Sequence, residues 1–174
     1  TNREWLFADL GILGAGGVAN GIYPTDAPAQ VEYLLADSAS VALFVEDEEQ
    51  LDKVLEVRAR LPKLRKIVVF DMDGLRDFDD AQVMSLEALR ALGADFDEKH
   101  EGVWEKRLGT RHAGDLAILV YTSGTTGRPK GVHRPLSDNP HDGDDGLQLM
   151  HRHLFKSTPG STFPSSSSSD APPP

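Results

Sequence analysis

The chain has no cysteine among its 174 residues, which excludes a disulfide framework and any site built on a thiolate. It has no apolar run near the ~20 residues that a membrane-spanning helix requires, and no signal-peptide pattern. Positive charge is scarce, because 28 acidic residues outnumber 18 basic ones and the formal net charge is -10. A nucleic-acid-binding protein needs a basic surface to neutralise phosphates, so this balance argues against one. We therefore expect an acidic, soluble, cytoplasmic protein.

Short apolar runs recur through residues 1–132 and alternate with segments of helical spacing. The runs that are typical of strands are 18–23, 41–45, 67–70 and 116–121. Strands that alternate with helices imply crossover connections and a parallel sheet. We therefore predict the α/β fold class, with a partial parallel-sheet domain over residues 1–132.

Start and stop signals mark the helices between these strands. Thr25 or Asp26 is predicted to cap a helix that carries Pro28 in its first turn. Ser85 is predicted to cap a shorter helix that ends at Gly93. Both signals place helices between successive strands, as a parallel sheet requires.

The composition changes after Val132. Residues 133–174 contain no valine or isoleucine, and serine or proline occupies 15 of these 42 positions. Such a segment cannot bury enough apolar surface to offset the entropy lost on ordering, so we expect a disordered, low-complexity tail. Its histidines, like His133 at its start, are interpreted as solvated residues and not as metal ligands.

The segment that follows the strand at 116–121 carries the chemistry. Residues 121–131 read Tyr-Thr-Ser-Gly-Thr-Thr-Gly-Arg-Pro-Lys-Gly. Glycines permit close backbone approach to a ligand, and successive N–H groups can form an anion-binding concavity. A loop at the carboxyl end of a parallel strand is also where open α/β sheets bind ligands. The predicted polyphosphate site consists of Thr122, Ser123, Gly124, Thr125, Thr126, Gly127 and Lys130.

Composition alone is equally compatible with an ordinary surface loop, since Gly, Ser, Thr and Pro are common in loops. The segment is also not the common nucleotide loop, because Lys130 is followed by Gly131 where that pattern needs Ser or Thr. The ordered string is more specific than its composition. Residues 121–132 closely resemble the signature loop of the adenylate-forming (AMP-binding) superfamily, which includes acyl-CoA synthetases, luciferases and peptide-synthetase adenylation domains. Segments 2–5, 21–25 and 30–34 look like the long-chain fatty acyl-CoA synthetase branch.

This resemblance implies a ligase reaction in two steps. A fatty acid carboxylate attacks the α-phosphate of ATP to give an acyl-adenylate and pyrophosphate, and CoA then displaces AMP. In that family the loop carried here by residues 122–130 holds the β- and γ-phosphates with the help of Mg²⁺. The implied small molecules of the intact parent are therefore ATP, Mg²⁺, CoA and a fatty acid, with no nucleic acid and no transmembrane segment. Peripheral membrane association of the parent is compatible with this assignment.

Most of the family's machinery is not found after Val132. The adenine-binding segment, the ribose-binding Asp and the C-terminal domain with its catalytic lysine have no counterpart there. We therefore assign no catalytic and no metal-ligating residue to this chain, and expect a truncated fragment that is inactive by itself. We interpret the tail as a shifted reading frame of a synthetase gene; an unusual exon end or a misassembled chain are the alternatives.

Two other functions stay open. Residues 67–74 resemble the first motif of haloacid-dehalogenase-type phosphatases, with Asp71 as nucleophile and Asp73 as general acid, although Leu75 departs from that pattern. The other is a non-catalytic remnant that keeps weak polyphosphate affinity. Residues 14–19 fit a dinucleotide fingerprint, but they close a helix and open a strand, so tight helix–strand packing is predicted instead.

Overall fold

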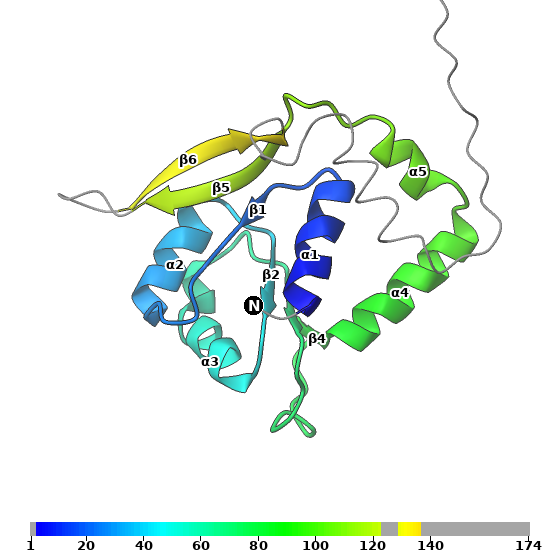
Figure 1. Ribbon diagram of the computed structural model, residues 1–174. Coiled ribbons are helices and arrows are strands. Elements are labelled where there is room, and N and C mark those ends of the chain that lie inside the picture. The colour runs from blue at the N-terminus through cyan, green and yellow to red at the C-terminus, as the bar shows by residue number, and fades with distance from the viewer. Residues whose placement is uncertain (1–2, 123–128, 137–174) are drawn as a thin grey trace, which may run out of the picture. The chain divides into compact units, whose positions relative to one another are not determined.

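A computed structural model describes residues 3–122 and 129–136 of the chain (Figure 1). The described part confirms the predicted α/β class, with parallel strands and helical crossovers. The helices are α1 (Arg3–Gly14), α2 (Pro28–Asp37), α3 (Glu48–Val57), α4 (Leu86–Lys99) and α5 (Val103–Leu108), with a 3-10 turn at Arg58–Arg60. The strands are β1 (Ala19–Asn20), β2 (Ala42–Val45), β3 (Lys66–Val69), β4 (Val83–Ser85), β5 (Leu116–Thr122) and β6 (Lys130–Pro135). They form two three-stranded sheets.

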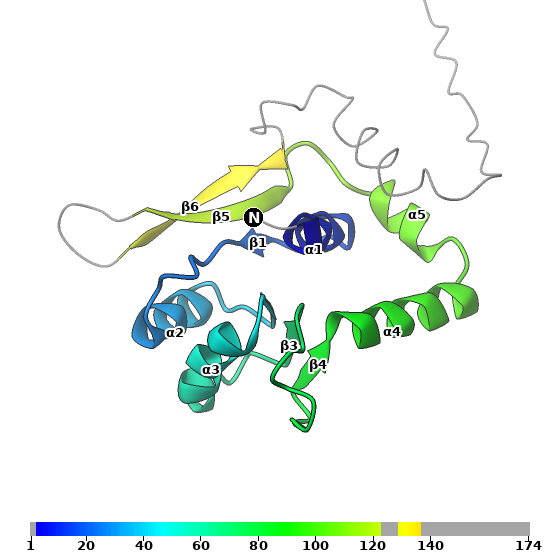
Figure 2. The ribbon, with the colours of Figure 1, turned by 60° about the horizontal axis from the view of Figure 1, so that its bottom comes forward.

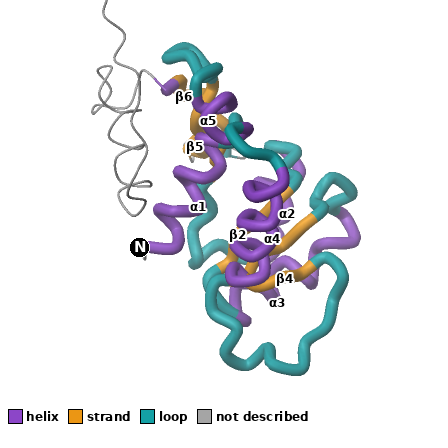
Figure 3. The backbone as a smooth tube through the Cα atoms, turned by 90° about the vertical axis from the view of Figure 1, so that its right-hand side faces the viewer, coloured by secondary structure: helices purple, strands orange, loops and turns teal. Residues whose placement is uncertain are grey.

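The first sheet has the order β2-β3-β4 and is parallel throughout. Its central strand, β3, is the apolar run that the sequence predicted, and its last three residues are buried. β4 was not predicted, because Val83–Ser85 is too short to show a period of two. A long connection between β3 and β4 extends beyond the sheet (Figure 3).

The hydrophobic core lies between this sheet and the helices α2 and α3, which pack against each other (Figure 2). α3 is built for this position, since its apolar residues recur on one face and its N-cap Asp47 accepts a hydrogen bond from the Gln50 amide at 3.0 Å. The core residues are Val31, Leu35, Val45, Leu51, Val54, Val57, Leu61, Leu64, Ile67, Val69 and Leu75. All of them fall within residues 31–75, so the core is contributed by one continuous part of the chain.

The second sheet has the order β1-β5-β6. β1 is parallel to β5, but it consists of only two residues of the predicted 18–23 strand. β6 is antiparallel to β5 and departs from the all-parallel expectation. It continues to Pro135 and therefore passes the predicted domain boundary at Val132. The rest of the predicted tail, residues 137–174, lies outside the described residues.

The start of α2 differs from the prediction. Neither Thr25 nor Asp26 caps α2; Ala27 holds that position without a side-chain bond, and Pro28 opens the helix as predicted. The Asp26 carboxylate instead accepts a hydrogen bond from the Tyr23 amide at 3.2 Å, because a short polar side chain can also cap a turn.

α4 confirms its predicted start and extends its end. Ser85 accepts a hydrogen bond from the Ala88 amide at 3.0 Å, as an N-cap does. The helix then runs through Gly93 to Lys99, because glycine weakens a helix without ending it. None of the described helices is long and apolar enough to cross a membrane.

The glycine-rich stretch between α1 and β1 permits close packing of α1 against the helix α5, where packing of a helix on a strand was predicted. α1 ends at Gly14 and β1 begins at Ala19, which is the reverse of the order that a dinucleotide fingerprint requires. A side chain at position 14 would collide with the ring of Trp104 on α5. Gly16 adopts a φ of 84°, which favours glycine. These residues therefore let α1 approach α5 and turn the chain into β1.

Candidate phosphate-binding loop

The predicted site residues begin and end on paired strands. β5 closes with Thr122 and β6 opens with Lys130, and these two residues are partners in the antiparallel register. The structure therefore brings the first and last of the predicted phosphate-binding residues opposite each other. The other five, Ser123, Gly124, Thr125, Thr126 and Gly127, lie outside the described residues. We call β5, β6 and the segment that joins them the phosphate hairpin.

The two faces of the phosphate hairpin differ. Successive side chains of a strand point to opposite faces, and partners across the ladder share a face. Thr122 and Lys130 therefore lie on the same face as Val120 and Val132, the pair two positions further along the ladder. All four side chains are exposed. Tyr121 points to the opposite face and is partly buried.

Lys130 is suited to bind an anion. Its side chain is exposed at the end of a strand, and in residues 3–122 and 129–136 no carboxylate lies within ion-pair distance of its ammonium group. An ammonium group is a compact charge with three donors, as used in many phosphate sites. With the Thr122 hydroxyl on the same face, the arrangement offers hydrogen-bond donors and a positive charge to a phosphate.

Helix α2 contacts the phosphate hairpin on both strands' sides. We call β5 one stem, and β6 together with Pro129, the residue directly before it, the other stem. The Tyr121 hydroxyl donates a hydrogen bond of 2.7 Å to the Asp37 carboxylate, and the Tyr33 hydroxyl donates one of 2.8 Å to the Pro129 carbonyl. The two tyrosine rings also meet edge to face, with centroids 6.4 Å apart. Tyr33 and Asp37 are not among the site residues predicted from the sequence. Their spacing of four residues was the available signal, because it puts both side chains on one face of a helix.

Burial raises the pKa of the Tyr121 hydroxyl to about 12, and the neighbouring Asp37 carboxylate adds to the shift through the hydrogen bond and its charge. Both causes disfavour a tyrosinate. Tyr121 therefore remains a neutral hydrogen-bond donor, and its contact with Asp37 persists throughout the neutral pH range.

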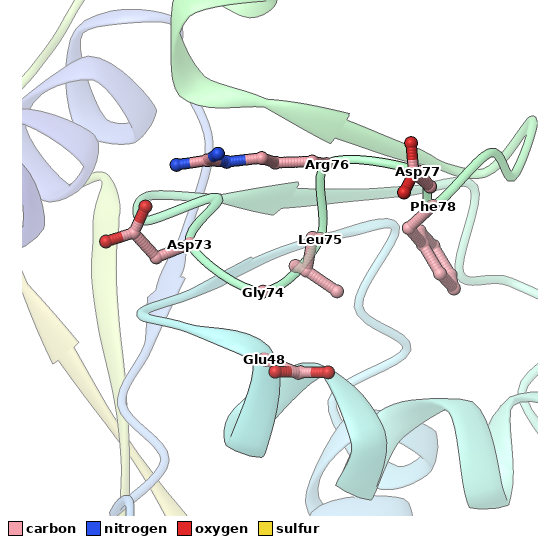
Figure 4. Close-up of a pocket in the computed structure, with 7 residues that line it drawn as sticks. All are labelled: Glu48, Asp73, Gly74, Leu75, Arg76, Asp77 and Phe78. Carbon is pink, nitrogen blue, oxygen red and sulfur yellow. The ribbon is translucent and has the colours of Figure 1, made fainter.

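The acidic loop after β3 carries Asp71 and Asp73, the two carboxylates of the predicted alternative site. Asp71 accepts a hydrogen bond from the Asp73 amide at 2.9 Å, which is a turn contact. An open hollow of about 660 Å³ lies beside this loop and is lined by Glu48, Asp73, Gly74, Leu75, Arg76, Asp77 and Phe78 (Figure 4). Asp71 is not among these residues, and Asp77 lies at the far end of the loop from Asp73. Of the two carboxylates of the phosphatase pattern, Asp73 lines this hollow and Asp71 does not.

Metal ligands do not gather in the described part of the chain. Within residues 3–122 and 129–136, no group of three or more His, Asp or Glu side chains could hold an ion. His133 lies on β6 as the partner of Leu119, and the other tail histidines, His141, His151 and His153, fall outside the described residues.

The sequence of the chain matches a known protein family. The model of the AMP-binding enzyme family matches residues 1–139, which is most of the chain. The chain belongs to the AMP-binding enzyme family. This match includes both stems of the phosphate hairpin and the acidic loop after β3. It also extends past Val132, where the sequence analysis had placed the end of the family likeness.

Curated relatives of this AMP-binding chain are long-chain-fatty-acid–CoA ligases. The human ligase ACSBG1 is 34% identical over 129 residues, which are 74% of this chain and 17% of that protein. The ligase FadD15 of Mycobacterium bovis is 34% identical over 156 residues, which are 90% of this chain and 24% of that protein. The chain thus spans about a fifth of the length of these relatives.

Solved structures show the same fold for this part of the family. The anthranilate CoA ligase AuaEII, solved with anthranoyl-AMP, superposes with a TM-score of 0.58 at 27% identity and covers 79% of this chain and 24% of that one. An acyl-CoA synthetase of Brucella canis superposes with a TM-score of 0.52 at 17% identity, over 78% of this chain and 22% of that one.

Proposed function

We propose that this chain carries the polyphosphate-binding part of an ATP-dependent acyl-CoA synthetase, and that the phosphate hairpin holds the β- and γ-phosphates of ATP. The observation that carries the proposal is the pairing of Thr122 with Lys130 at the mouth of the glycine-rich segment. Both are exposed on one face, and a hydroxyl and an ammonium group there supply donors and charge for a polyphosphate.

The role of such a site in the reaction is positioning and charge neutralisation. As the α-phosphate is attacked, negative charge moves onto the leaving pyrophosphate, and donors aimed at that charge lower the barrier. Mg²⁺, bound through the phosphate oxygens, would neutralise part of the same charge. Within the described residues we assign neither a nucleophile nor a general base to this chain.

The substrate of the intact parent is proposed to be a long-chain fatty acid, with CoA as the acceptor. The support is the likeness to ACSBG1 and FadD15, whose names state this activity. We propose further that the 174 residues do not catalyse adenylation alone, since the adenine- and ribose-binding motifs of the family have no counterpart in the sequence. The phosphatase alternative has no such support, since the match of the AMP-binding enzyme family also covers Asp71 and Asp73.

The first prediction concerns Lys130. Isothermal titration of the full chain with MgATP and with inorganic tripolyphosphate should give measurable binding, and Lys130→Ala should weaken it by at least about tenfold, because a charge-assisted hydrogen bond is lost. Lys63→Ala is the matched control, since Lys63 is also exposed and also forms no ion pair within the described residues. Its affinity should stay within about twofold of the wild type.

Equal affinities for the Lys130→Ala and Lys63→Ala variants would overturn the assignment of the site. Carboxylate-dependent exchange of pyrophosphate into ATP, measured on the same preparation, separates binding from catalysis. Robust exchange would contradict the proposal that this chain alone is inactive.

A further inference from the structure

Helix α2 presents two opposite faces to two different parts of the protein. Val31 and Leu35 belong to the hydrophobic core and are only 5% and 3% exposed. Tyr33 and Asp37 face the phosphate hairpin, which they reach through their hydrogen bonds. Residues four apart share a helix face, whereas residues two apart lie about 200° from each other. α2 therefore joins the hydrophobic core to the proposed site.

The two contacts of α2 fall next to the two ends of the site. Tyr121, which Asp37 binds, directly precedes Thr122, and Pro129, which Tyr33 binds, directly precedes Lys130. One helix thus holds both stems of the phosphate hairpin at hydrogen-bond lengths of 2.7 and 2.8 Å. The Tyr121 side chain lies on the face of the hairpin opposite to that of Thr122 and Lys130, and the Tyr33 ring contacts the Tyr121 ring there.

We infer that Tyr33 and Asp37, here called the α2 pair, are positioning residues for polyphosphate binding: they fix where Thr122 and Lys130 stand while remaining on the other side of the hairpin. The inference rests on the proposed function of the hairpin. Its physical basis is that donors held in place before binding do not have to be ordered by the ligand. Loss of either contact frees one stem, and the ligand must then offset the entropy of holding it.

Titration of the full chain with inorganic tripolyphosphate in the presence of Mg²⁺ tests the inference. Tyr33→Phe removes the hydrogen bond to Pro129, whereas Asp37→Asn removes the charge from the acceptor of the Tyr121 hydroxyl and leaves a weaker, neutral acceptor. Both changes keep the shape of the side chain. Tyr33→Phe should raise the Kd by about threefold to tenfold, the range expected for one hydrogen bond, and Asp37→Asn by about threefold to fivefold, the range expected for the loss of charge assistance. Thermal unfolding of the same samples checks that each variant is folded, and the two variants affect different stems, so one of them suffices if the other does not fold.

Matched controls come from similar residues without these contacts. Tyr23→Phe removes a hydroxyl from a side chain that is 73% exposed, and Asp52→Asn neutralises an exposed carboxylate on α3. Both should bind tripolyphosphate within about twofold of the wild type. A purely structural effect of the α2 pair would lower the melting temperature and leave the Kd unchanged.

A double-mutant cycle between Asp37 and Lys130 distinguishes a positioning role of Asp37 from an effect that does not act through Lys130. If Asp37 acts by placing Lys130, then Asp37→Asn should have a smaller effect on the Kd in the Lys130→Ala background than in the wild type. Equal effects in both backgrounds, or wild-type affinity in Tyr33→Phe and Asp37→Asn, would overturn the inference and leave the phosphate site intact. Absence of binding by the wild type would overturn the proposed function itself, and with it this inference.

Discussion

The hydroxyl group of Tyr121 has a protonation state that the surrounding structure controls. Its pKa is raised to about 12 from an ordinary value of 10.0, first by burial and then by the carboxylate of Asp37. The neutral hydroxyl donates to Asp37, whereas a tyrosinate would lose that hydrogen bond and face a second negative charge. The folded state therefore prefers the neutral form more strongly than the unfolded state does.

This preference predicts how stability changes with pH. Below pH 10 both states keep Tyr121 protonated, so the full contribution is present; between pH 10 and about pH 12 only the unfolded state ionises, and stability falls. In a near-ultraviolet titration, one tyrosine should ionise last, and Tyr121→Phe should remove that step. Asp37→Asn should move the step to lower pH and weaken the stability loss. A late step that persists in Tyr121→Phe would assign the shift to another residue.

At the scale of elements, α4 and α5 show that the effect of replacing a glycine depends on its backbone conformation. Gly93 lies inside α4, is exposed, and has nothing within 4 Å of the place where a Cβ would stand. Gly102, the N-cap of α5, is equally open but adopts a φ of 76°. The two glycines thus differ in conformation and not in available space.

Substitution of these glycines by alanine should have opposite effects. Gly93→Ala should stabilise the protein by about 0.5–1 kcal/mol, because alanine loses less backbone entropy in a helix. Gly102→Ala should destabilise it by about 1–2 kcal/mol, because a side chain in the left-handed region is strained. Urea unfolding followed by circular dichroism measures both. Destabilisation by Gly93→Ala would mean that α4 ends there, as the sequence first suggested.

Elements with strong local signals were predictable, and those that depend on partners were not. β2, β3 and β5 were predictable as apolar runs in the sequence. The first turn at Pro28 and the N-cap Ser85 were predictable because both act on neighbouring residues of the chain. β6 carries Gly131 and Pro135 and is almost wholly exposed, so nothing in its own residues favours a strand; its pairing with β5 creates it. The same holds at the candidate site. The loop could be predicted from the order of its residues. Tyr33 and Asp37 could not, because they contact the loop's neighbours about ninety positions away in the chain.

At the scale of the described chain, burial is distributed unevenly. Of the apolar residues that are buried within residues 3–122 and 129–136, only Ala19 and Ala117 lie outside residues 31–75. α4 and α5 contain no buried residue at all. Stability within a protein follows local contact and burial, so opening should begin away from the core.

Hydrogen exchange measured by mass spectrometry should reveal this order. Amides of α3 and β3 should be protected longest, whereas those of α4, α5 and β6 should exchange much earlier. Lowering the global stability with Ile67→Ala, at a residue that is 0% exposed, should speed exchange in α3 and β3 and change that of α4 little. Uniform acceleration of all segments would indicate a single cooperative unit instead.

The uneven burial also affects how freely the phosphate hairpin can diverge. Most random substitutions lower stability, and a protein tolerates them only while a reserve remains. Thr122 and Lys130 are exposed and do not belong to the hydrophobic core, so replacing them should lower the free energy of unfolding only a little. The folding of residues 31–75 and the chemistry of the hairpin are thereby placed under largely separate selection. A library of variants at positions 122 and 130 should therefore differ widely in ligand preference and hardly at all in yield of folded protein.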